Sequence, residues 1–262
     1  MLLPNRSKLM LAMFTFCLAI LFPLVSSAQS KVEQLLNKLD ENYYYPQNKG
    51  LIKMSSQLEW EQENIKSKKV LTLKKPNFIF EGELIGEIFE KKIKPAINLK
   101  NKSDENITES IEFLNNYLDA FFPKTLREKF IHYKGTIGSR LGSETVIILK
   151  KIGSIQDFND YELFVDEKKW RISKMVLRQN QEPKKIEGKF FYARKAGKWV
   201  VEETLSIFKV NSQEYMEKTK YKYRSLHSFW MVSKIKQTVM QEGNMILSYK
   251  FNLNDYKLSS RR

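Results

Sequence analysis

The stretch MILSYKFNL, residues 245–253, has the clearest β-strand pattern in the chain. Its odd-numbered side chains are apolar, whereas the even-numbered ones, apart from Ile246, are polar. Successive side chains of a strand point to opposite faces of its sheet. The alternation therefore predicts a strand with one buried or ligand-facing side, preceded by a turn at residues 241–244 around Gly243.

Runs of the same kind fill the chain backward from this strand to residue 143. Tyr161, Leu163 and Val165 alternate with Glu162 and Asp166, and the polar segment 166–169 predicts the reversal into the next strand. Further turns are expected at residues 179–183 and around Gly197. This spacing of turns predicts an antiparallel meander of about six to eight strands between residues 143 and 258.

The region before the meander changes between helical and strand periods. Apolar residues at helical spacing predict helices at about residues 30–44, at 103–122 before Pro123, and at 125–133 before Gly135. Strands are expected over 51–60, 69–73 and 78–93. We therefore predict a single α+β domain with a large curved antiparallel sheet and with helices laid against one of its faces.

The first 28 residues have the three parts of a cleavable signal peptide. Arg6 and Lys8 form a basic start, residues 9–25 are an apolar run, and Ser26-Ser27-Ala28 provides small residues for cleavage. We expect cleavage after Ala28, so that residues 29–262 form the mature domain in the periplasm. An uncleaved N-terminal anchor is the alternative.

Composition excludes several kinds of site. One Cys and two His offer too few ligands for a disulfide framework, an iron–sulfur cluster or a Cys/His zinc site, and no phosphate-binding glycine loop is present. We expect no cofactor and no metal. The net charge of +15 comes from dispersed lysines, which favours transient attraction to anionic membrane surfaces over nucleic-acid binding.

Three stretches resemble the periplasmic outer-membrane lipoprotein carriers of the LolA/LolB-like superfamily. LTLKKPNFIFE at 71–81 resembles the strand–basic–proline–aromatic segment of this family, and LFVDEKKWRI at 163–172 resembles its hairpin. FWMVSKI at 229–235, with FNL at 251–253, resembles its closing strands. The resemblance implies an open half-barrel whose concave face holds acyl chains under a cover of helices.

The resemblance also implies site residues, all of which need only provide an apolar concavity. The candidates for the lipid-binding lining are Leu58, Trp60, Phe78, Phe80, Tyr249 and Phe251. The candidates for the lid are Leu114, Leu118, Phe121, Phe122 and Lys75, the last of which occupies the place before the motif proline where the carriers usually have Arg.

The predicted function is that of a non-enzymatic, monomeric carrier in the periplasm. It would bind the acyl chains of lipoproteins or lipids and transfer them to the outer membrane, with transfer partners in the inner and outer membranes. An envelope-sensing or protein-interaction module on the same scaffold is the first alternative. A hydrolase that uses Glu81 or His132 is the second, although neither residue belongs to a recognisable catalytic motif.

Overall fold

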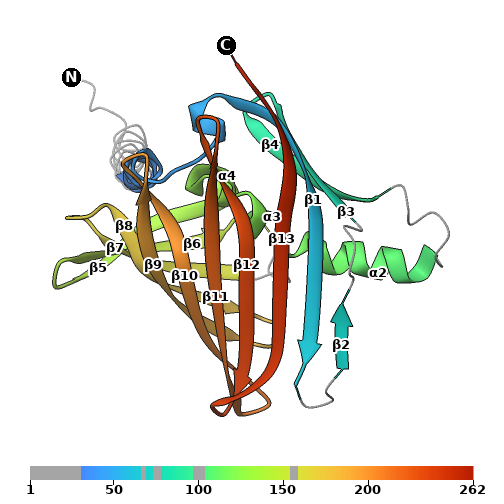
Figure 1. The fold of residues 1–262 in the computed structure, drawn as a ribbon. Coiled ribbons are helices and arrows are strands. Elements are labelled where there is room, and N and C mark those ends of the chain that lie inside the picture. The colour runs from blue at the N-terminus through green and yellow to red at the C-terminus, as the bar shows by residue number, and fades with distance from the viewer. Residues whose placement is uncertain (1–30, 66–68, 73–77, 97–103, 154–158, 262) are drawn as a thin grey trace, which may run out of the picture.

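The structure is a computed structural model that describes residues 31–65, 69–72, 78–96, 104–153 and 159–261. The predicted signal peptide at 1–28 and the lid candidate Lys75 lie outside these ranges. Figure 1 shows one strongly bent sheet with helices inside the bend. None of the helices in the described ranges has the length and apolar character of a membrane-spanning helix.

Thirteen strands form one antiparallel sheet in the order β4-β3-β1-β13-β12-β11-β10-β9-β8-β7-β6-β5, with β2 paired to β1 beside this path. The sheet does not close, because β4 and β5 end it on opposite sides. The strands are β1 (Leu51–Asn64), β2 (Lys69–Thr72), β3 (Phe78–Ile85), β4 (Ile88–Pro95), β5 (Tyr133–Leu141), β6 (Glu144–Lys151), β7 (Asn159–Asp166), β8 (Arg171–Gln179), β9 (Lys185–Lys195), β10 (Lys198–Val210), β11 (Gln213–Leu226), β12 (Phe229–Gln241) and β13 (Asn244–Ser260). The predicted single-domain open half-barrel is confirmed.

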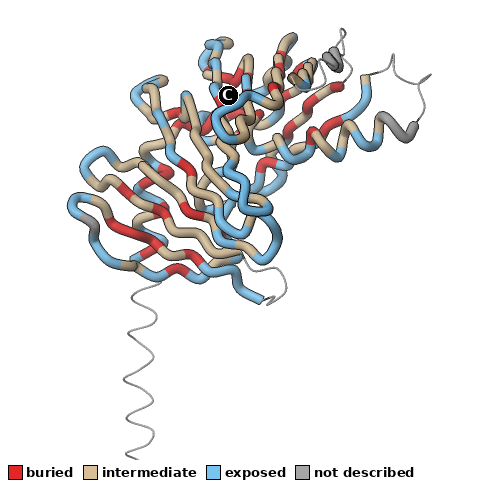
Figure 2. The backbone as a smooth tube through the Cα atoms, turned by 90° about the horizontal axis from the view of Figure 1, so that it is seen from below, coloured by how far each residue is buried: buried red, intermediate tan, exposed pale blue. Residues whose placement is uncertain are grey.

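The meander is also confirmed, because β6 to β13 are eight consecutive strands that each pair with the next. Buried residues are interspersed with more exposed ones in the sheet, as Figure 2 shows, and they are frequent in β12. The C-terminal strand β13 then pairs with β1, so that Leu58 lies opposite Leu253 and Trp60 opposite Phe251. This pairing places the first and last strands of the chain side by side in the middle of one half of the sheet.

Residues 31–42 form the N-terminal helix, which is followed by the 3₁₀ turn η1 (Gln47–Lys49). The other helices are α2 (Asp104–Asn115), α3 (Leu118–Phe121) and α4 (Leu126–Phe130). The expected helix over 103–122 is therefore interrupted at Tyr117, which has a non-helical backbone before α3. Thr125 begins α4 with a capping box to Glu128, which satisfies free backbone amides of the first turn.

Two sequence-based element boundaries differ from the structure. The expected strand over 78–93 is a hairpin, because Gly86 adopts a positive φ of 62° and reverses the chain between β3 and β4. The expected helix over 125–133 ends at Phe130, and β5 starts at Tyr133. The residues from Tyr133 onward pair with β6, and Gly135 lets the N-terminal helix pack directly on this strand, since a Cβ there would lie 2.4 Å from Val32.

The helices divide the inner side of the sheet into two hydrophobic cores. The aromatic core joins α2 and α3 to β1, β3, β4, β12 and β13, with Phe80, Phe121 and Phe251 among its fully buried residues. The N-terminal core joins the N-terminal helix and α4 to β5 through β8, around Leu39 and Leu163. Between them, β10 contributes no residue to either core.

Candidate functional site

A cavity of about 330 Å³ lies between the two cores. Its floor is formed by β7 to β12, and its cover by α3, α4 and the segment 43–46 that follows the N-terminal helix. Apolar and aromatic side chains form most of its wall, among them Phe190, Tyr221 and Met231. Ligand cavities of proteins occupy roughly 300–1,000 Å³ and have this kind of wall, with a few polar groups to orient the ligand.

Tyrosine hydroxyls hold the wall of the cavity in place. The Tyr192 hydroxyl donates to the Ile172 carbonyl at 2.8 Å and lies 3.0 Å from the Tyr43 hydroxyl, which in turn accepts the Ile172 backbone amide at 2.8 Å. Burial raises the pKa of Tyr43 to about 12, so this hydroxyl stays protonated at neutral pH. The Tyr223 hydroxyl donates to the Val201 carbonyl at 2.8 Å. These bonds satisfy polar atoms that an apolar guest could not satisfy.

The charged groups of the cavity come from the helical cover. Asp119 pairs with Lys91 of β4, whose nitrogen also donates to the Phe122 carbonyl at 2.8 Å and whose side chain is only 4% exposed. Lys124 and Lys129 belong to the wall as well. Lys129 is exposed to solvent, and desolvation where it lines the cavity lowers the pKa of its ammonium.

The structure brings the predicted lining and lid residues together in the aromatic core. Phe121 of α3 contacts the rings of Phe80 and Phe251, with centroids 5.6 and 5.5 Å away. Phe113 of α2 lies 4.9 Å from the Trp60 ring and 5.3 Å from the Tyr249 ring. The remaining candidates, Leu58, Phe78, Leu114, Leu118 and Phe122, are members or close neighbours of the same core. Helix side chains therefore occupy the concavity in which an acyl chain was expected.

Of the predicted site residues that the structure describes, Phe121 and Phe122 line the cavity. The other walls were missed by sequence reasoning, which treated the strands from β8 to β11 as ordinary meander. The alternation of Tyr221 and Tyr223 with lysines on β11 is the signal that could have indicated an aromatic inner face there. The spacing of aromatic residues in the sequence does not distinguish a side chain in a filled core from one that lines a cavity.

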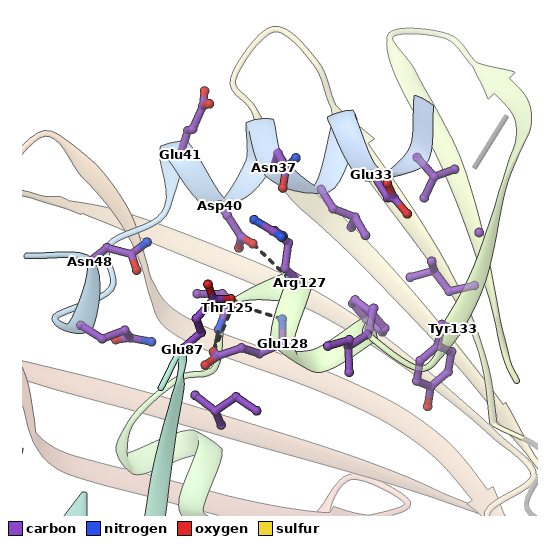
Figure 3. A pocket seen from close by; sticks show the side chains of 18 residues that line it. Glu33, Asn37, Asp40, Glu41, Asn48, Glu87, Thr125, Arg127, Glu128 and Tyr133 are labelled. Carbon is purple, nitrogen blue, oxygen red and sulfur yellow. Dashed lines mark hydrogen bonds between the residues drawn. The ribbon is translucent and has the colours of Figure 1, made fainter. Parts of the chain in front are cut away.

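A second hollow, a groove of about 780 Å³, lies between the N-terminal helix, α4 and the β3–β4 turn (Figure 3). Its wall is rich in polar side chains. Asp40 accepts the backbone amides of Leu126 and Arg127 at 2.8 and 3.1 Å and the Tyr45 hydroxyl at 2.8 Å, while Glu128 bonds to Thr125. These groups hold α4 against the N-terminal helix, so the groove fits a hydrocarbon tail less well than the cavity does.

Glu81 and His132, the candidates of the hydrolase alternative, lie apart from the cavity wall. Glu81 forms an ion pair with Lys94 at 2.8 Å, and this hydrogen bond lowers its pKa. His132 is exposed in the turn between α4 and β5. The two residues are not brought together with each other, and the carboxylate is engaged in an ion pair across β3 and β4.

No protein-family model and no curated protein matches this chain. Similar solved structures include a LolA superfamily protein from Nitrosomonas europaea, at 9% identity and a TM-score of 0.33 over 88% of this chain and 94% of the other. An outer membrane lipoprotein-sorting protein domain from Vibrio parahaemolyticus is 13% identical, with a TM-score of 0.34 over 86% and 91%. A chain of the MucA/MucB complex of Pseudomonas aeruginosa is 8% identical, with a TM-score of 0.22 over 87% of this chain and 99% of the other. The observed open sheet agrees with the curved antiparallel half-barrel expected from the sequence.

Proposed function

We propose that this protein is a non-enzymatic carrier that binds acyl chains in the cavity between its two cores. The observation that carries the proposal is the apolar and aromatic wall of that cavity, which lies under short helices on the inner side of an open sheet. Burial of a methylene is worth about 0.8 kcal/mol, so such a wall needs no catalytic group to retain a hydrocarbon tail.

The volume of the cavity sets how much of a tail it holds. A methylene occupies about the space of a water molecule in the liquid, roughly 30 Å³, so 330 Å³ accommodates about 11 methylenes. A longer tail has to enter the neighbouring aromatic core. Phe121 stands between the two spaces, because it lines the cavity and also packs on Phe80 and Phe251.

The aromatic core supports a role for α2 and α3 as a displaceable lid. The rings of Phe113, Tyr117 and Phe121 pack on the inner face of β1 and β13. We propose that a long tail moves these rings aside and then contacts the predicted lining residues, Trp60 and Tyr249 among them. The ligand has to bind the open state better than the closed one for the lid to yield.

The expected signal peptide and the resemblance to the lipoprotein carriers support a place for this cycle in the periplasm. There the protein would take acyl chains of lipoproteins or lipids from the inner membrane and release them at the outer membrane. Its surface carries many lysines, and these would favour brief contact with anionic membranes.

The test is lipid mass spectrometry on the full chain after export and purification in mild buffer. We expect co-purified acyl chains, and we expect Ala120→Phe to reduce them because Ala120 lines the cavity. Ala193→Phe is the matched control, because Ala193 of β9 does not belong to the cavity wall. Absence of lipid together with a stoichiometric bound protein would favour the interaction module and contradict the carrier.

A further inference from the structure

The charged groups around the cavity are not equivalent. Asp119 is neutralised by Lys91, which is itself held by the Phe122 carbonyl. Lys129 differs from Lys91, because no carboxylate among the described residues lies within ion-pair distance of its ammonium. The cavity wall therefore contains one acid that is already paired and two lysines, Lys124 and Lys129, that take part in no ion pair with the described residues.

The surroundings of Lys129 offer its ammonium rings instead of anions. Its nitrogen lies 5.8 Å from the centre of the Phe130 ring and 5.6 Å from that of Tyr161. Cation–π contacts of this kind compensate desolvation only in part. Asp119 exerts a favourable Coulombic effect on Lys129 from a distance, and Lys124, which also borders the cavity, opposes it. An anion beside Lys129 would form the ion pair that its ammonium lacks among the described residues.

The hydroxyls of the wall cannot supply that anion. Tyr43 and Tyr192 bond to each other and to the backbone of Ile172, and Tyr44 accepts the backbone amide of Trp230 at 2.8 Å. The Tyr45 hydroxyl donates to Asp40. The aromatic wall therefore offers a ligand a mainly apolar surface, whereas Lys129 offers it a positive charge.

We infer that the cavity selects amphiphiles that carry a single anionic head, a carboxylate or a phosphate, with the head paired to Lys129 and the tail along the aromatic wall. The inference rests on the proposed function, which requires only the tail, and adds the chemistry and the orientation of the head. Lys124, which also lines the cavity, adds to the positive electrostatic potential there, so a ligand with a neutral or cationic head is disfavoured.

The test compares lauric acid, lauryl phosphate and lauryl alcohol, whose tails are equal, by isothermal titration calorimetry with the full mature chain. We expect both anionic ligands to bind about tenfold more tightly than the alcohol, as one partly desolvated ion pair implies. Lys129→Met should remove most of this preference without weakening the alcohol, and Lys129→Arg should retain it. Lys189→Met, which removes one exposed charge beside the wall residue Phe190, is the control.

The outcomes separate the two proposals. If all three ligands bind equally and Lys129→Met changes none of them, the tail site stands and the head-group inference is overturned. If none of the three binds, the proposed function itself fails. If the acid alone or the phosphate alone keeps its preference and loses it in Lys129→Met, the inference holds and the source of the head is identified.

Discussion

Affinity for saturated fatty acids should rise with chain length and then stop rising over a few added methylenes. We call this interval the pause, and the chain length at which it begins follows from the cavity volume. Each methylene that enters contributes about 0.8 kcal/mol, or about a fourfold gain in affinity, until about 11 methylenes fill the 330 Å³. The next methylenes have to displace Phe121 from the rings of Phe80, Phe251 and Tyr117. At about 0.5–1.5 kcal/mol for each ring pair, this displacement offsets about two to six methylenes.

The perturbation is Phe121→Ala, which opens the cavity toward the aromatic core. Removing a fully buried Phe lowers the free energy of unfolding by about 3–5 kcal/mol, and a typical domain tolerates this loss. We expect the pause to disappear in this variant, so that affinity keeps rising with chain length. Phe89→Ala is the matched control, because Phe89 is buried in the same core but does not line the cavity.

The assay is displacement of a fluorescent fatty acid by a series of unlabelled ones, measured for the wild type and both variants. Urea unfolding of each variant confirms that it is folded at the assay temperature. An affinity in the wild type that does not depend on chain length would refute the cavity as the tail site. A pause that stays at the same length in Phe121→Ala would refute the role of that ring as the barrier.

Three further substitutions test how the fold holds the site. Gly82→Ala should lower the unfolding free energy by about 1–3 kcal/mol, because its Cβ would lie 2.3 Å from the Phe89 ring, whereas Gly188→Ala, with 3.9 Å of room, should be nearly neutral in the same urea titration. Burial raises the pKa of Asp40, so the folded state holds its proton more tightly than the unfolded chain. The contribution of Asp40 to stability is therefore present below about pH 4 and is lost as pH rises through the pKa of the folded state. The unfolding free energy of the wild type, measured relative to that of Asp40→Asn, should fall from pH 4 to pH 7. A rise over this range would contradict a raised pKa of Asp40. Tyr43→Phe leaves a buried amide of β8 without its acceptor and should cost about 1–3 kcal/mol, seen as a lower Tm in calorimetry; an unchanged Tm would show that the tyrosine network does not hold the wall.

The sequence was sufficient to predict the meander, because the period of two in its strands is a local property. The alternation around Tyr249 and Phe251 and the turns at Gly197 and Gly243 needed no knowledge of distant residues. The Pro123 stop and the Thr125 start of α4 are local signals too. In contrast, the packing of β5 on the N-terminal helix brings together Gly135 and Val32, which lie about 100 residues apart in the chain, and no local pattern shows such a contact.

The position of the hollow could not be predicted for the same reason. Phe80, Phe113 and Phe251 come from three distant segments, and their rings fill the concavity of β1, β3 and β13 only after these strands and α2 have assembled. Alternation indicates which side of a strand faces inward, but the space left inside depends on which helix side chains occupy it. Lys129 was overlooked because lysines are common in this chain and only its position beside the cavity distinguishes it.

The most direct test of the central claim is a crystal structure of the protein with lauric acid that carries a bromine on its terminal carbon, with anomalous scattering used to locate the bromine. We expect a bromine peak inside the cavity, under α3 and above the β10–β12 strands. A bromine bound in the polar groove beside the N-terminal helix, or on the outer face of the sheet, with the cavity empty, would contradict it.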